Sequence, residues 1–107
     1  MKKIYIILMI MTYQASYAGG SNEKIIQPIA NHTGILFFHA NSKVNTPNCG
    51  LPQPERWAID TSTPGGKTMA ALVMTAFALG KSVAVTGAEN CDIWGDTESI
   101  DYLFISN

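Results

Sequence analysis

Charged residues are scarce in this chain of 107 residues. They make up 14% of the sequence, and only seven of them are basic. Because binding to nucleic-acid phosphates requires a dense stripe of Lys and Arg, this composition excludes a nucleic-acid-binding surface. The sequence also has no polybasic amphipathic helix that would hold the chain on an anionic membrane.

Motifs for catalysis and metal binding are also missing. The chain has no HExxH, no nucleophile elbow and no CxxC pair. His32 and His39 are seven residues apart, without a third ligand at a recognisable spacing, so they indicate neither a metal centre nor acid–base chemistry. The segment PGGKT at 64–68 is similar to the end of a phosphate-binding loop, but Thr61 stands where that motif needs glycine. We therefore expect no enzymatic activity, no metal and no cofactor.

Apolar runs long enough to span a membrane are absent, but a short one lies near the start of the sequence. Two lysines precede the apolar segment Ile4–Met11, and small residues follow it at a cleavage position that ends with Ala18. This pattern is typical of a secretory signal peptide. We expect residues 1–18 to be removed and residues 19–107 to form one exported domain, periplasmic or secreted. That domain carries five basic and eight acidic side chains, a net charge of −3.

Cysteine is represented by two residues, Cys49 and Cys91. In an exported chain an even number of cysteines favours a disulfide bond. A domain this small buries only about 60% of its unfolded surface, so it has much to gain from a crosslink. Closing the 43-residue loop would contribute about 4 kcal/mol by the chain-entropy relation. The alternative is a pair of buried thiols.

The rest of the chain is organised around a strand, a helix and a second strand between Trp57 and Thr86. The helix is expected at about residues 64–79. Thr63 can cap its first turn, proline suits its first position, and Gly80 can adopt the left-handed conformation that ends it.

Both faces of this helix are apolar. One face has the spacing of a stripe that packs on a core, and it consists of Met69, Leu72, Val73, Ala76 and Phe77. The other face is rich in small residues and is expected to contact another copy of the chain through Ala70, Ala71, Met74 and Ala78. Alternatively this second face is simply exposed, because alanine favours helices wherever it stands.

Shorter apolar runs predict strands at 25–29, 35–39, 56–60, 82–88 and 99–106. The run at 35–39 is almost continuously apolar, which indicates burial on both faces. The first two runs form either a hairpin or one bent strand. Alternation along the last strand predicts Ile100, Tyr102 and Phe104 on one face, and Asp101, Leu103 and Ile105 on the other.

The most specific polar cluster is the segment from Asn90 to Thr97, NCDIWGDT. The face of an indole can stack on the C–H groups of a sugar ring while carboxylates and amides bind its hydroxyls. The candidate ligand-binding residues are therefore Trp94, Asp96, Asn90 and Thr97. The alternative is that Trp94 folds back over the disulfide and fills the core.

The second half of the chain resembles a known family. A strand, a helix ending in Leu79-Gly80-Lys81, the strand Val83-Ala84-Val85, Cys91, Trp94 and a final apolar strand follow in the order of the receptor-binding B subunits of the cholera toxin and heat-labile enterotoxin group. The resemblance covers roughly Arg56–Asn107. The segment CDIW is one residue longer than the family's Cys-x-Trp motif. The family's opening helix with its cysteine is lacking, and Cys49 lies in a mid-chain loop. The segments STPGGK and WGDTES are also similar to a broader set of small exported bacterial proteins of unknown role.

This resemblance implies an α+β, mainly β fold: a small OB-like antiparallel barrel with one helix. We expect the Cys49–Cys91 bridge, which the cysteine count predicts, to hold this barrel together. It also implies a non-enzymatic subunit that binds a glycan or glycosylated receptor, assembles as a homo-oligomer, as a pentamer in that family, and can accompany a catalytic A subunit. OB-type barrels bind oligosaccharides or oligonucleotides through their loops, and the charge excludes the latter. A second hypothesis is an exported protein-interaction module, such as an enzyme inhibitor, that acts through the loop Asn41–Glu55.

Overall fold

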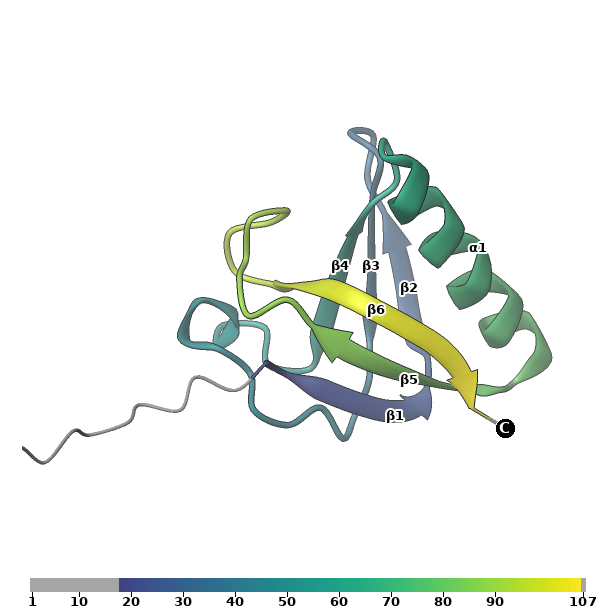
Figure 1. The fold of residues 1–107 in the computed structure, drawn as a ribbon, viewed down its shortest axis with the longest axis horizontal. Helices are drawn as coiled ribbons and strands as arrows, with labels where there is room; N and C mark the ends of the chain where they lie inside the picture. The colour runs from purple at the N-terminus through teal and green to yellow at the C-terminus, as the bar shows by residue number, and fades with distance from the viewer. Residues whose placement is uncertain (1–17, 107) are drawn as a thin grey trace, which may run out of the picture.

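The computed structural model describes residues 18–106, which form a six-stranded mixed sheet with one α-helix (Figure 1). The predicted α+β, mainly β class is confirmed. The strands are β1 (Gly20–Lys24), β2 (Ile26–Ala30), β3 (Ile35–His39), β4 (Arg56–Asp60), β5 (Ser82–Gly87) and β6 (Glu98–Ser106). The α-helix is α1 (Pro64–Leu79), and the loop before β4 contains a short 3-10 helix, η1 (Asn48–Gly50). Apart from Ala18, the predicted signal peptide lies outside the described residues.

The strand order in the sheet is β1-β5-β6-β4-β3-β2. Neighbouring strands are antiparallel except β4 and β6, which run parallel. β2 and β3 form a hairpin, and Gly34 in its turn has a φ of 85°. The two edge strands, β1 and β2, are consecutive in the chain and are separated only by Ile25. The sheet does not close into the expected antiparallel barrel, because its edge strands β1 and β2 do not pair with each other. The chain passes directly from one edge strand to the other through Ile25.

The main hydrophobic core lies between the curved sheet and α1. Its fully buried members include Trp57, Phe38 and Ile59, and the indole Nε1 of Trp57 donates a hydrogen bond to Ser21 Oγ at 3.0 Å. A second, smaller cluster lies on the other face of β3 and β4 and consists of Ile35, Phe37 and Ala58 with Ile93 packed against them. The predicted burial of β3 on both faces is therefore confirmed.

The ends of α1 follow the local signals in the sequence. Thr63 Oγ1 accepts a hydrogen bond from Gly66 N at 2.9 Å, and Gly80 has the left-handed φ of 66°. A side chain at Gly66 would overlap the backbone of Asp60, so the helix can approach β4 this closely only with glycine there. This contact explains a glycine of the PGGKT segment without any phosphate.

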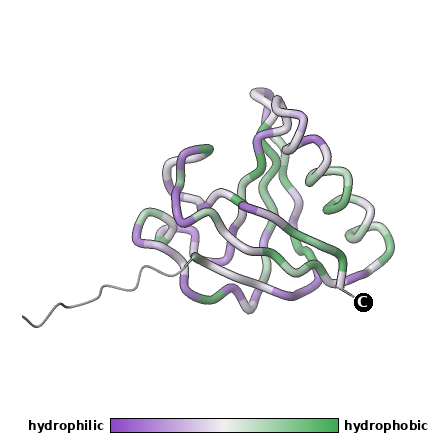
Figure 2. The backbone as a smooth tube through the Cα atoms, viewed as in Figure 1, coloured by the Kyte–Doolittle hydropathy of each residue, from purple (hydrophilic) through white to green (hydrophobic). Residues whose placement is uncertain are grey.

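The packed stripe of α1 is narrower than the sequence predicted. Val73 and Ala76 are fully buried, but Leu72 and Phe77 are 38% and 44% exposed, so their assignment to the core was wrong. Ala70 was expected on the outward face, yet it packs partly against the core. The helix rests on β4, β5 and β6 along a narrow line, and the residues flanking this line remain open. Figure 2 shows hydrophobic residues along much of α1.

The predicted faces of β6 were also partly wrong. Thr86 pairs with Tyr102 and the next residue of β5, Gly87, pairs with Ile100, so Asp101 is an extra residue in β6. Such a bulge reverses the alternation of side chains. As a result Ile100 and Leu103 both face the core, whereas Tyr102 and Phe104 are more than half exposed. The exposed pair adds to the apolar surface of the domain.

A lysine and a glutamate form an ion pair inside the domain. Lys43 Nζ lies 3.2 Å from Glu98 Oε1, and both side chains are completely buried. Lys43 Nζ also donates to the carbonyl oxygen of Arg56 at 3.2 Å and lies 4.0 Å from the centre of the Trp57 ring. Burial lowers the pKa of Lys43, and the Glu98 carboxylate opposes this shift.

The other carboxylate oxygen of Glu98 is bound by the backbone. Glu98 Oε2 accepts hydrogen bonds from Gly19 N at 3.0 Å and from Glu89 N at 3.2 Å. Glu98 therefore ties together the start of β1, the end of β5 and, through Lys43, the loop that follows β3. Nothing in the local sequence around Glu98 indicated these long-range contacts.

The predicted disulfide is confirmed. Cys49 in η1 is bonded to Cys91 in the loop between β5 and β6, and their Cα atoms are 6.1 Å apart. Because disulfide bonds form and persist in oxidising compartments, this bond suggests that the protein resides in one. Among the described residues, no helix combines the length and the apolar character needed to cross a membrane.

Candidate functional site

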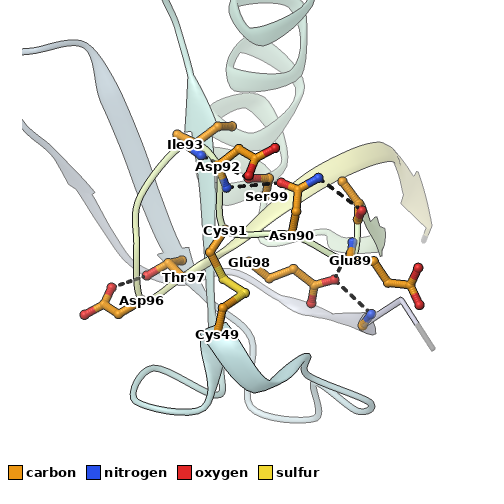
Figure 3. Close-up of a disulfide and its surroundings, with 12 residues drawn as sticks. Cys49, Glu89, Asn90, Cys91, Asp92, Ile93, Asp96, Thr97, Glu98 and Ser99 are labelled. Atoms are coloured by element: carbon orange, nitrogen blue, oxygen red, sulfur yellow. Dashed lines mark hydrogen bonds between the residues drawn. A yellow bond between two sulfur atoms is a disulfide. The ribbon is translucent and has the colours of Figure 1, made fainter. Parts of the chain in front are cut away.

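The loop between β5 and β6, residues 88–97, carries the predicted ligand-binding residues and is firmly anchored. Its base is closed by hydrogen bonds from Ala88 N to Ser99 O and from Ser99 N to Asn90 O, at 2.9 and 2.8 Å. Its tip is closed by the Thr97 N to Trp94 O bond, and the disulfide holds it to η1 (Figure 3). Because the loop is closed at both ends, its backbone is held in place.

Trp94 lies at the surface with its ring supported from one side. Its indole is 5.3 Å from the Phe37 ring, with an angle of 83° between the planes, which is an edge-to-face contact. Trp94 is nevertheless 41% exposed. The alternative that Trp94 folds back to fill the core is not what the structure shows, because Ile93 occupies the adjacent apolar cluster.

Asp96 is held by an arginine from the first position of β4. Arg56 Nη2 lies 2.7 Å from Asp96 Oδ1, and Arg56 Nε donates to Thr97 Oγ1 at 2.8 Å. Thr97 in turn donates to Asp96 Oδ1 at 2.9 Å. The guanidinium group of Arg56 lies 4.6 Å from the centre of the Phe37 ring, so it is fixed by stacking as well.

Of the four predicted site residues, two are available at the surface and two use their side chains for contacts within the protein. Trp94 and Asp96 are partly exposed and lie at the loop surface. Thr97 is fully buried, and its hydroxyl is used by Arg56 and Asp96. The Asn90 side chain bonds within the loop, to Ala88 O and Asp92 N. Figure 3 shows Thr97 beside Asp96 on one side of the disulfide and Asn90 on the other.

Sequence analysis missed Arg56 and Phe37 as partners of this site. Arg56 is 40 residues from Asp96 in the sequence, and Phe37 lies within an apolar run that indicated only a core strand. The sequence offers only a weak signal for Arg56, namely that it is the single arginine of the chain. Its partner could not be identified without knowing that β4 lies beside β6.

The remaining candidates lie apart from this loop. Figure 1 shows α1 on one side of the sheet and the loops that carry the disulfide on the other. Of the four residues expected at an oligomer interface, Ala71, Met74 and Ala78 are exposed, and Ala70 is partly buried. His32 lies in the β2–β3 turn and His39 ends β3. Residues 18–106 contain no group of three or more His, Cys, Asp or Glu side chains placed to hold a metal ion.

Comparison of the chain with protein-family models, with curated proteins and with solved structures found no match.

Proposed function

We propose that this protein is a non-enzymatic, exported subunit that binds a glycan or a glycosylated receptor through the loop at 88–97. The observation that carries the proposal is the partly exposed indole of Trp94, held in edge-to-face contact with Phe37 beside the Arg56–Asp96 pair. A fixed aromatic face next to a carboxylate is the combination that recognises a sugar ring and its hydroxyls.

The connectivity of the sheet supports an OB-type topology. If β1 and β2 are counted as one bent strand, five strands remain, and the helix stands between the third and the fourth. In this count the loop at 88–97 joins the fourth and fifth strands. That loop is one of the two that OB folds use for oligosaccharides. Topology alone does not give a function, so the argument depends on the side chains of the loop.

The polar part of the site is already organised for binding. The contacts of Asp96 within the described residues fall on Oδ1, which leaves Oδ2 as an acceptor for a sugar hydroxyl. Arg56 fixes the carboxylate so that little rotational freedom is lost when a ligand binds. The disulfide has the same effect on the loop backbone.

A pair of surface substitutions tests this proposal. Trp94→Ala should weaken glycan binding at least tenfold, about 1.4 kcal/mol, while Trp94→Phe should retain part of the affinity. Leu51→Ala is the matched control, since Leu51 is 57% exposed on the separate loop before β4. Binding of the oxidised protein to a glycan array and titration of the best ligand provide the measurement. A Trp94→Ala protein that binds as well as the wild type would refute the proposal.

We further propose that the protein assembles as a homo-oligomer, a ring of five if it is the B component of a toxin with a catalytic A subunit. The support is the apolar surface of α1, where Leu72, Met74, Phe77 and Leu79 are 38–65% exposed. Sedimentation of the mature protein should show a species larger than a monomer, and Met74→Glu should shift it toward the monomer. A monomer at all concentrations would eliminate the toxin-like assembly.

A second candidate function is an exported protein-interaction module that acts through the loop Asn41–Glu55. The observation that favours it is the exposure of two large apolar side chains in this loop, Val44 at 58% and Leu51 at 57%. The same two variants separate the candidates. A protein partner that co-purifies from culture should be lost with Leu51→Ala and kept with Trp94→Ala, the reverse of the result expected for a glycan.

A further inference from the structure

The buried carboxylate of Glu98 lies against the first residue of the predicted mature chain. Gly19 N is 3.0 Å from Glu98 Oε2, and Gly19 itself is buried. The position of Gly19 is fixed by the sheet, because Gly19 O accepts a hydrogen bond from Gly87 N at 2.8 Å. The next residue, Gly20, exchanges two backbone hydrogen bonds with Val44. The nitrogen of residue 19 is therefore aimed at the carboxylate by the backbone alone.

The space around this carboxylate admits only glycine. A Cβ on Gly19 would overlap Oε1 of Glu98, and a Cβ on Gly87 would overlap Oε2. Gly20 differs, since a Cβ there would make an ordinary contact of 3.7 Å with Val85 O. The structure thus requires glycine at position 19, directly after the predicted cleavage point, but does not require it at position 20.

We propose that cleavage of the Ala18–Gly19 bond creates an N-terminal ammonium group that forms an ion pair with Glu98 and stabilises the mature domain. Hydrolysis by an export peptidase consumes one water molecule, leaves a carboxylate on Ala18 and frees the amino group of Gly19. That amino group, with an ordinary pKa of about 8, takes up a proton at neutral pH. The inference depends on the predicted export and not on glycan binding.

The charges of the pocket favour such a group. Glu98 has two oxygens, and Lys43 pairs with Oε1 only, while Oε2 is bound by neutral backbone amides. Cleavage would convert one of these amides into a cationic donor, and charge-assisted hydrogen bonds are roughly twice as strong as neutral ones. The same atom positions thus serve a stronger contact after processing.

Two forms of the oxidised protein test the proposal without altering the core. One begins at Gly19 and the other retains Ala18, each released from a cleavable fusion. We expect an amine-acylating reagent near pH 7 to label the terminal amine of the Gly19 form at least tenfold more slowly than the terminal amine of the form that retains Ala18. The exposed Lys67 and Lys81 serve as internal references. We also expect the Gly19 form to melt about 5 °C higher. Equal labelling rates and equal melting temperatures would overturn the proposal.

Two further measurements examine the processing site and the need for glycine. The intact mass of the protein exported with its own leader should correspond to a chain that starts at Gly19, and a different start would refute the inference.

Gly19→Ala should melt lower than Gly20→Ala, its matched control, and should lose the protection of its terminal amine. If the two alanine variants were equally stable and equally protected, the pocket would not hold the amino group. Should Gly19→Ala fail to fold, the comparison of the two unsubstituted forms still decides.

Discussion

Replacement of Glu98 by glutamine should lower the free energy of unfolding by about 3–5 kcal/mol, because it leaves the Lys43 ammonium group buried without its counter-charge. The side chains of both residues are completely inaccessible to solvent, so water cannot replace the lost partner. Denaturation by urea, followed by tryptophan fluorescence, would measure the change. A loss below about 1 kcal/mol would contradict the proposed importance of the pair.

The double variant Lys43→Met/Glu98→Gln is the control for this experiment. It removes both charges, so it should be less destabilised than the sum of the two single variants. The pH dependence provides a second check. The folded-state pKa of Lys43 is lowered by burial, and loss of Glu98 removes an interaction that raises it. The unfolded chain then binds more protons than the folded one, and the stability of Glu98→Gln should recover as the pH rises toward 10.5.

Loss of the disulfide is the second change with a large expected effect. Cys49→Ala/Cys91→Ala should reduce the free energy of unfolding by about 4 kcal/mol, since the bond closes a loop with a sequence separation of 42. The effect should extend to the candidate site, because the bond also fixes the loop at 88–97. Glycan affinity of the double variant should fall together with stability. Denaturation of the oxidised and the variant protein gives the first quantity, and titration gives the second.

Reduction of the wild-type protein is the matching control for the disulfide. A reductant should lower the unfolding midpoint of the wild type to that of the double variant and should leave the variant unchanged. If oxidised wild type and variant unfolded at the same denaturant concentration, the crosslink would contribute nothing and the loop would be held by its hydrogen bonds alone.

The features that could be predicted from the sequence are those with local causes. The bounds of α1 follow from Thr63, Pro64 and Gly80, whose effects act within a single turn. The disulfide could be predicted because only one pairing of two cysteines exists. The double-sided burial of β3 was visible in its continuous apolar run.

The features that the sequence did not reveal depend on distant partners. The bulge at Asp101 arises from the register between β5 and β6, and it decides which side chains of β6 are buried. The Arg56–Asp96 pair and the Lys43–Glu98 pair each connect residues at least 40 positions apart. The exposure of Leu72 and Phe77 depends on how much of α1 the curved sheet covers, and periodicity cannot measure that area.

The position of β6 has a consequence for the order of folding. This strand is the last of the six described strands in sequence order, yet it lies in the middle of the sheet between β5 and β4. The β2–β3–β4 and β1–β5 groups can pair separately, but they have no common neighbour until β6 has been synthesised. Pairing of β6 with β4 joins Trp57 to Glu98, and contacts of such high sequence separation slow folding. The complete sheet can therefore form only after β6 has been synthesised.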